Sequence, residues 1–147
     1  MTRQDHSQTI LVADDEPEVV DLVRLLLDWE GYTVVVAPDG EQALTQVQAL
    51  HPDLILLDVR MPKMNGLEVL EHLQADPILA SIPVVMLSVV TTYPQVATAL
   101  QRGAVAYLPK PFELREMSRL VQQILSRDAA EREILRQHAL KSLDAQW

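Results

Sequence analysis

Polar side chains that can do chemistry follow the apolar segments of this chain. They are three carboxylates, one hydroxyl and one ammonium group, those of Asp14, Asp15, Asp58, Ser88 and Lys110. Carboxylates that lie close together repel one another unless a cation lies among them. A hard divalent cation such as Mg²⁺, held by carboxylate oxygens, meets that need. A cation, a lysine and a hydroxyl group also form a receptor for a phosphoryl group, and one carboxylate can act as its acceptor.

The apolar segments themselves are typical of buried strands. Five short runs of branched and aliphatic residues lie at residues 10–13, 34–36, 54–57, 84–87 and 105–108. After them, apolar residues recur with helical spacing over residues 19–27, 39–50, 66–73, 96–100 and 114–125. Strands and helices that alternate in this way predict a doubly wound α/β fold, with a five-stranded parallel sheet between helices. Because ligands bind at the carboxyl ends of parallel strands, we expect the polar side chains to meet in one cleft.

Composition excludes several classes of protein. The formal net charge of −9 gives no electrostatic reason to bind nucleic acid or an anionic membrane, so we expect neither as a direct partner. The absence of cysteine excludes disulfides and thiolate catalysis. No stretch has the length and apolar character of a signal peptide or a membrane span. We therefore expect a cytoplasmic protein.

Four motifs together resemble the receiver domain of bacterial two-component response regulators. They are Asp14-Asp15, the loop Asp-Val-Arg-Met-Pro-Lys-Met-Asn-Gly at residues 58–66, Ser88, and Tyr-Leu-Pro-Lys-Pro-Phe at residues 107–112. The resemblance implies a flavodoxin-like sheet with strand order 2-1-3-4-5. It divides the chain into an N-terminal tail (1–8), a receiver domain (9–126) and a C-terminal helical extension or linker (127–147).

The resemblance also implies a role for each acidic residue of the site. Asp58 is expected to be the phosphoacceptor. Asp15 and Asp58 are expected to bind Mg²⁺ directly, together with the backbone carbonyl of Arg60. Asp14 is expected to act on the metal mostly through water.

The remaining site residues match the switch of the family. Lys110 is expected to pair with the phosphoryl oxygens, and Ser88 to donate a hydrogen bond to the phosphoryl group and report its presence. Tyr107 matches the switch aromatic, and the bond from Lys110 to Pro111 matches a peptide bond that is cis in this family. Val89 departs from the usual small residue and is expected to affect access to Asp58.

The function implied is that of a phosphorylation-activated signalling module. A sensor histidine kinase or a histidine phosphotransfer protein would donate the phosphoryl group to Asp58, and a downstream protein target would respond; a homodimer is left open. Such a module promotes its own phosphorylation and dephosphorylation and is not a conventional enzyme. Two alternatives stay open. One is an interaction module that has lost phosphorylation. The other is a Mg²⁺-dependent phosphatase with an aspartate nucleophile, although Asp14 and Asp15 are adjacent rather than in the Asp-x-Asp spacing of those enzymes.

The last residues, 126–147, have a different character. Their formal charges sum to zero, and their apolar residues do not continue the stripe of the preceding helix. Asp128 and Glu131 have the spacing of a capping box, which favours the start of a helix. We expect either an extension of the last receiver helix or a separate helix, with a role in dimerisation or as a linker.

Overall fold

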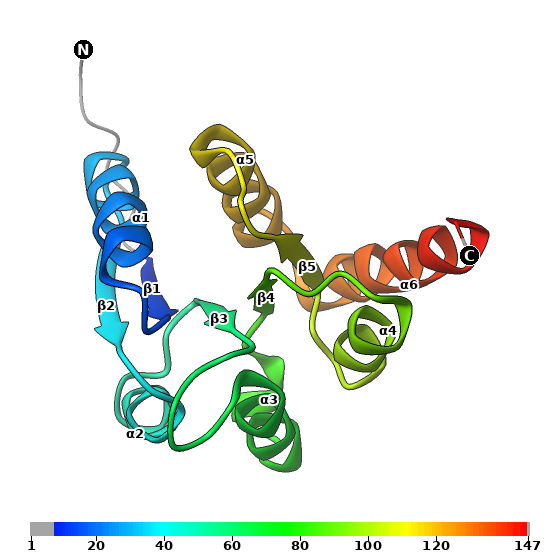
Figure 1. The fold of residues 1–147 in the computed structure, drawn as a ribbon, viewed down its shortest axis with the longest axis horizontal. Coiled ribbons are helices and arrows are strands. Elements are labelled where there is room, and N and C mark those ends of the chain that lie inside the picture. The colour runs from blue at the N-terminus through cyan, green and yellow to red at the C-terminus, as the bar shows by residue number, and fades with distance from the viewer. Residues whose placement is uncertain (1–7, 147) are drawn as a thin grey trace.

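A five-stranded parallel sheet forms the centre of the computed structural model, which describes residues 8–146 (Figure 1). Its strands are β1 (Thr9–Ala13), β2 (Thr33–Ala37), β3 (Leu54–Asp58), β4 (Val84–Ser88) and β5 (Ala106–Pro109). They are parallel in the order β2-β1-β3-β4-β5. The predicted fold class and strand order are therefore confirmed.

Helices cover both faces of the sheet. They are α1 (Pro17–Trp29), α2 (Gly40–Leu50), α3 (Gly66–Ala75), α4 (Tyr93–Gln101), α5 (Leu114–Leu125) and α6 (Ala129–Gln146), with a short 3₁₀ helix, η1 (Leu79–Ser81). The helices α1 and α5 lie on one face, and α2, α3 and α4 lie on the other (Figure 1). Within residues 8–146, every helix is too short or too polar to cross a lipid bilayer.

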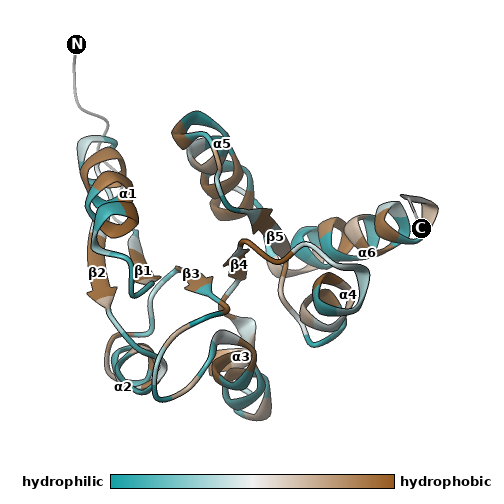
Figure 2. Cartoon of the chain, viewed as in Figure 1, coloured by the Kyte–Doolittle hydropathy of each residue, from teal (hydrophilic) through white to brown (hydrophobic). Residues whose placement is uncertain are grey.

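Two apolar cores result, one on each face of the sheet. Successive side chains of a strand point to opposite faces, so Leu11 and Ile55 join the core beneath α2 and α3, whereas Val12 and Leu56 join the core beneath α1 and α5. In Figure 2 the strands of the sheet are largely brown, the colour of hydrophobic residues, whereas the helices carry both brown and teal residues. Burial on both faces explains why the strands are continuous apolar runs. Because the strands are parallel, the polar residues that follow them lie at the carboxyl edge of the sheet.

The loop between β3 and α3 is closely packed at its end. Gly66 donates its backbone N–H to the Val59 carbonyl at 2.8 Å. A Cβ atom at position 66 would lie 2.2 Å from the Asp58 carbonyl oxygen, so only glycine fits there. Asn65 and Glu68 form a capping box that fixes the start of α3. The loop after Asp58 is therefore held close to the end of β3.

The C-terminal residues form a separate helix, α6. Asp128 accepts a hydrogen bond from the Glu131 backbone at 2.8 Å, and Glu131 accepts one from the Asp128 backbone at 3.0 Å. This is the predicted capping box. The helix turns back and lies beside α4 and β5 (Figure 1). The predicted domain boundaries stay predictions, and the predicted N-terminal tail lies outside the described residues except for Gln8.

Candidate functional site

Lys110 joins the carboxyl ends of three strands. Its ammonium nitrogen lies 2.7 Å from an Asp14 carboxylate oxygen, 3.0 Å from an Asp58 oxygen and 3.0 Å from a Glu16 oxygen. The Lys110, Asp14 and Asp58 side chains are almost fully buried, whereas Glu16 is exposed. The structure thus brings together three of the residues singled out from the sequence. Glu16 was not singled out, although it stands in the same acidic stretch as Asp14.

Backbone contacts set each of these side chains in place. At the end of β1, the Asp14 carboxylate accepts the Glu16 N–H at 2.9 Å, which orients it at the start of α1. At the end of β3, the Asp58 carboxylate accepts the Arg60 N–H at 3.2 Å. After β5, Lys110 donates its own N–H to the Ser88 carbonyl at 2.8 Å. The bond from Lys110 to Pro111 is cis, as the sequence resemblance implies.

Burial and charge shift the acidity of this cluster. Burial raises the pKa of the Asp58 carboxyl, and repulsion from Asp14 raises it further. The hydrogen bond and the charge of Lys110 oppose this shift, and the resulting pKa is about 6. Burial lowers the pKa of the Lys110 ammonium, but its hydrogen bonds to Asp14, Glu16 and Asp58 outweigh that effect and raise it. Lys110 therefore stays charged, and its charge alone does not restore an ordinary acidity to Asp58.

The donor set suits a divalent cation. Carboxylate oxygens of Asp14, Glu16 and Asp58 all lie within 4.8 Å of one another. Three carboxylates against one ammonium group leave two negative charges in excess, and oxygen donors are what Mg²⁺ prefers. Burial is the main cause of the raised pKa of Asp58, and the repulsion from Asp14 that adds to it reflects this excess. The residues present therefore fit the cation.

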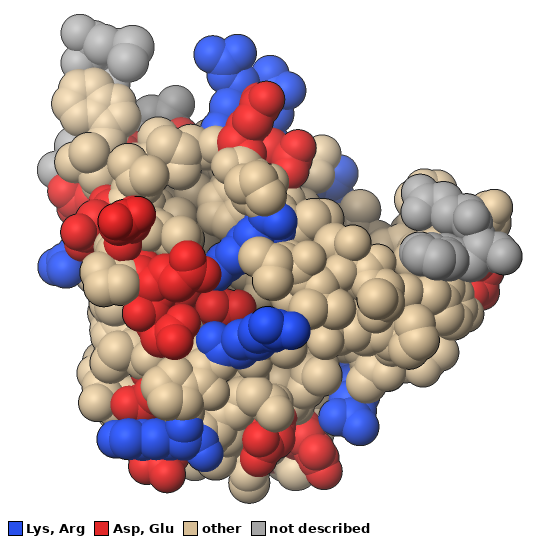
Figure 3. Space-filling model, in the orientation of Figure 1, with Lys and Arg blue, Asp and Glu red and all other residues tan. Residues whose placement is uncertain are grey.

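The other proposed metal ligands lie beside this cluster. Asp15 is exposed and lines a neighbouring hollow together with Arg60. The acidic group that the geometry gathers thus contains Glu16, whereas the sequence indicated Asp15 and the Arg60 carbonyl. Their assignment as ligands stays a prediction. Acidic side chains gather on this face over the loops that follow β1 and β3, with basic side chains beside them (Figure 3).

Ser88 and Tyr107 meet through a third residue, Gln95. The Ser88 side chain is buried at the end of β4, and its oxygen accepts the Val90 N–H at 3.0 Å. The Gln95 amide donates to the Tyr107 hydroxyl at 2.7 Å and to the Ser88 oxygen at 3.3 Å. The Tyr107 hydroxyl in turn donates to the Val90 carbonyl. The two predicted switch residues are therefore connected by a hydrogen-bonded network that the sequence did not indicate.

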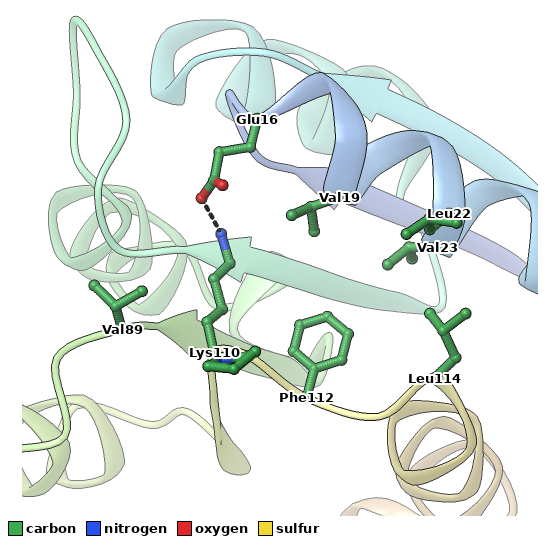
Figure 4. A pocket seen from close by; sticks show the side chains of 9 residues that line it. Glu16, Val19, Leu22, Val23, Val89, Lys110, Phe112 and Leu114 are labelled. Atoms are coloured by element: carbon green, nitrogen blue, oxygen red, sulfur yellow. Dashed lines mark hydrogen bonds and ion pairs between the residues drawn. The ribbon is translucent and has the colours of Figure 1, made fainter.

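An apolar recess of about 360 Å³ adjoins the charged cluster. It lies between the start of α1 and the segment after β5, and Lys110 and Glu16 form its polar edge (Figure 4). Val89 lies at its rim with 59% of its surface exposed. Phe112 and Leu22 line its apolar part. The branched side chain at position 89 thus lines the same recess as Lys110 and Glu16.

Known proteins share these features. The family model described as the response regulator receiver domain matches residues 10–122. The DNA-binding response regulator MtrA of Mycolicibacterium smegmatis is 41% identical over 124 residues, which are 84% of this chain and 53% of MtrA. The alkaline phosphatase synthesis transcriptional regulatory protein PhoP of Bacillus subtilis is 39% identical over 121 residues, covering 82% of this chain and 50% of PhoP. The matched region thus spans about half the length of these relatives.

Solved structures are similar over the whole receiver region. A response regulator from Chloroflexus aurantiacus has a TM-score of 0.78 and 32% identity, covering 83% of this chain and all of that one. A CheY-like receiver domain protein from Methanospirillum hungatei has a TM-score of 0.78 and 26% identity, covering 87% of this chain and 98% of that one.

These relatives correct one prediction. We expected no direct binding of nucleic acid, and this is wrong, because the MtrA proteins that match are named DNA-binding response regulators. The net charge of −9 is that of these 147 residues, whereas the matched region is only about half the length of those relatives. A separate part of a longer protein can carry its own basic surface. An acidic receiver region therefore does not exclude nucleic acid as a partner.

The strand order, the buried cluster of Asp14, Asp58 and Lys110, and the sequence matches lead to the same family. The match covers most of the chain, and the relatives exceed 30% identity over more than four-fifths of it. The chain belongs to the response regulator receiver domain family.

Proposed function

We propose that this chain is a phosphorylation-activated signalling module in which Asp58 accepts a phosphoryl group from a histidine kinase or a histidine phosphotransfer protein. The observation that carries the proposal is the contact of Lys110 with Asp14 and Asp58 in a buried cluster of excess negative charge. Such a cluster can take up a divalent cation and then an anionic group. The transfer itself is one of positioning and charge neutralisation.

Asp58, Lys110 and Ser88 each have a separate role in the transfer. An Asp58 carboxylate oxygen forms the new bond to phosphorus, while the bond from phosphorus to the donor nitrogen breaks and leaves its electron pair on that nitrogen. With a pKa of about 6, Asp58 is mostly ionised at neutral pH, as a nucleophile must be. Lys110 neutralises charge on the transferred oxygens, and Ser88 donates a hydrogen bond to one of them.

Mg²⁺ is the proposed cofactor, and it supplies positive charge against the phosphoryl oxygens when bound. Among residues 8–146, carboxylate oxygens of Asp14, Glu16 and Asp58 lie within 4.8 Å of one another, which suits them for holding it. Asp15 and the Arg60 carbonyl, which line the adjoining hollow, complete the proposed set. The sequence resemblance favours Asp15 and the Arg60 carbonyl as ligands, whereas the geometry of the side chains favours Glu16.

A protein donor needs a surface on which to dock, and the apolar recess beside Lys110 offers one. Leu22 is 54% exposed and Val89 is 59% exposed, so apolar surface lies open next to the charged cluster. Burial of such surface favours association. We propose that the donor protein packs here while its phosphorylated histidine reaches Asp58.

For the response that this module controls, we propose only a general process. Relatives named for DNA binding and for transcriptional regulation support transcriptional control as the process that this module switches. Transcript levels in cells that carry Asp58→Asn would differ from those with the unchanged chain. Identical profiles under the activating signal would remove this output from consideration. The cytoplasmic location stays a prediction.

The phosphoacceptor is tested by intact-mass measurement after incubation with acetyl phosphate and Mg²⁺. The expected result is the addition of one phosphoryl group to the unchanged chain and none to Asp58→Asn. An adduct that persists in Asp58→Asn would refute the site. If neither acetyl phosphate nor a cognate kinase modifies the unchanged chain, the interaction module without phosphorylation is the better description. Repeated turnover of a phosphomonoester would instead point to the phosphatase.

A further inference from the structure

One face of α6 lies along the domain for the length of the helix. Its half-buried residues recur at spacings of three and four, which places them on a single face: Arg132, Leu135, Arg136, Ala139, Leu140 and Leu143. Leu135 packs against the core that includes Val105 and Leu108, whereas Ile134 points away and is 69% exposed. Most of the stability of a helix in a protein comes from the packing of one face rather than from helix propensity. Contact with α4 and β5 therefore stabilises α6 as a helix.

Two polar contacts fix α6 against α4. The Arg136 guanidinium donates to the Leu100 carbonyl at 2.6 Å, in the last turn of α4, where carbonyl groups carry partial negative charge. Glu133 holds that guanidinium with a hydrogen bond of 2.9 Å. At the other end, the Tyr93 hydroxyl donates to Asp144 at 2.7 Å. The two helices thus lie antiparallel.

The spacing of these contacts is matched on both helices. Tyr93 and Leu100 are about 11 Å apart along α4, and Arg136 and Asp144 are about 12 Å apart along α6, from the rise of 1.5 Å per residue. Both contacts can therefore form at once without bending either helix. The face formed by α4 and β5 accordingly accepts a helix with an arginine, an apolar stripe and a carboxylate two turns beyond the arginine.

The same end of α4 contacts the switch residues. Gln95 stands two residues after Tyr93 and donates to both Tyr107 and Ser88. Its distance to the Ser88 oxygen, 3.3 Å, lies just beyond the usual range for such bonds, so this bond is weak. A small movement of Ser88 toward Asp58 would remove this bond. The start of α4 is therefore in contact with the switch on one side and with α6 on the other.

We propose that α6 is a detachable occupant of the helix-binding face of α4 and β5, and that phosphorylation of Asp58 loosens it through Ser88, Gln95 and α4. The second half rests on the proposed function; the first half does not. The vacated face would then accept a partner helix of the chemistry that α6 itself presents. A ligand shifts such an equilibrium only by its different contacts in the two states, and the bond from Gln95 to Ser88 supplies that difference.

The absence of cysteine allows a direct test by thiol labelling. Ala139→Cys places a thiol on the face of α6 that touches the domain, and Ser142→Cys places one on its exposed face. Without a phosphoryl mimic, Ala139→Cys is expected to react with a maleimide about tenfold more slowly than Ser142→Cys, the protection that ~1.4 kcal/mol of docking gives. Addition of Mg²⁺ and beryllofluoride is expected to remove most of that protection and to leave Ser142→Cys unchanged.

Two further variants separate the parts of the proposal. In the Ala139→Cys background, Arg136→Gln is expected to expose the thiol without beryllofluoride, which tests docking independently of phosphorylation. Gln95→Leu is expected to keep beryllofluoride binding, measured by fluorine NMR, but to lose the response of the thiol. If the unchanged chain takes up neither phosphoryl group nor beryllofluoride, the proposed function fails while the Arg136→Gln result still decides docking.

Three results would overturn the inference. The first is equal labelling of Ala139→Cys and Ser142→Cys in the resting protein. The second is unchanged protection in a protein that has bound beryllofluoride. The third is protection that rises with protein concentration, because that would mean that α6 docks on a second copy of the chain.

Discussion

The Lys110 ammonium nitrogen lies 2.7 Å from an Asp14 carboxylate oxygen, across two strands of the sheet. Lys110 follows β5 and Asp14 follows β1, and β3 and β4 lie between those strands. Lys110 therefore reaches past the carboxyl ends of β4 and β3 to Asp14, and it also contacts Asp58, at 3.0 Å. It is a fixed positive charge within the site, present before any cation or phosphoryl group arrives.

Removal of that charge is expected to destabilise the fold. Lys110→Met leaves Asp14 and Asp58 buried without their cation, and a broken buried pair costs about 3 kcal/mol. The free energy of unfolding, measured with urea in the absence of Mg²⁺, is expected to fall by about that amount. Mg²⁺ is expected to restore part of the loss, because a bound cation again neutralises the carboxylates.

Lys63→Met is the matched control. Lys63 pairs with Asp39 at 3.7 Å, but its side chain is 57% exposed, so we expect a loss of less than about 1 kcal/mol. Equal losses in the two variants would show that Lys110 has no special structural role.

Asp58→Asn is expected to stabilise the metal-free protein at pH 7.5. The fold raises the pKa of Asp58 from 3.8 to about 6, so the folded state binds a proton more readily than the unfolded chain between those values. The ionised carboxylate therefore destabilises the folded state above pH 6. The free energy of unfolding rises as the pH falls through 6 toward 4. The shift corresponds to roughly 2–3 kcal/mol.

The increase in the free energy of unfolding that Asp58→Asn causes is therefore expected to become smaller as the pH falls. Urea unfolding at pH 7.5 and at pH 4.5 gives the comparison, with Asp21→Asn, at an exposed position of α1, as the control. Asp21→Asn is expected to change stability by less than about 0.5 kcal/mol at either pH. A gain from Asp58→Asn that is the same at both pH values would contradict the raised pKa.

Gly66→Ala is expected to destabilise the loop that carries the phosphoacceptor. The added methyl group would stand 2.2 Å from the Asp58 carbonyl oxygen, so the backbone at one of the two positions must move. Overpacking of this kind costs about 1–3 kcal/mol. Glu71→Ala, at an exposed position of the same helix, is expected to stay within about 0.5 kcal/mol of the unchanged chain. Equal stability of the two variants would mean that the loop tolerates the displacement.

Leu22→Asp is expected to slow phosphoryl transfer from a protein donor without slowing transfer from a small-molecule donor. The recess beside Lys110 would acquire a charged group and lose apolar surface, so transfer from a histidine kinase that phosphorylates the unchanged chain should slow by tenfold or more, equivalent to about 1.4 kcal/mol. Acetyl phosphate needs no docking surface, and its rate of modification should not change. Leu25→Asp, exposed on the same helix but outside the recess, is the control. Equal slowing by both variants would remove the recess as the docking surface.

The sheet and the charged cluster could be predicted because they depend on short-range patterns. Continuous apolar runs identify strands buried on both faces, and parallel strands bring their carboxyl ends to one edge. This is why Asp14, Asp58 and Lys110 were found from the sequence. Which carboxylates stand closest to one another depends on how each side chain turns at the end of its strand, and no periodic pattern encodes that. Glu16 was missed for this reason.

The sequence did not indicate a role for Gln95, because the predicted helix begins after it. The apolar spacing indicated a helix from residue 96, whereas α4 begins at Tyr93, with Pro94 in its first turn. Proline at that position is a signal for a helix start, and it could have moved the boundary. The docking of α6 could not be read from the sequence, because it combines a half-buried apolar stripe with polar contacts to residues far away in the chain.

The two contacts of α6, at Leu100 and at Tyr93, are joined by one helix. While either contact holds, the other end of the helix stays near its partner and meets it at a high effective concentration. A transient loss of one contact is then quickly reversed, whereas its permanent loss, as in Arg136→Gln, leaves the other contact to hold the helix alone. A signal that enters at the end near Tyr93 releases α6 only when it shifts α4 enough to weaken the contact at Leu100 as well. The antiparallel pairing therefore sets a threshold, below which weak signals leave the face covered.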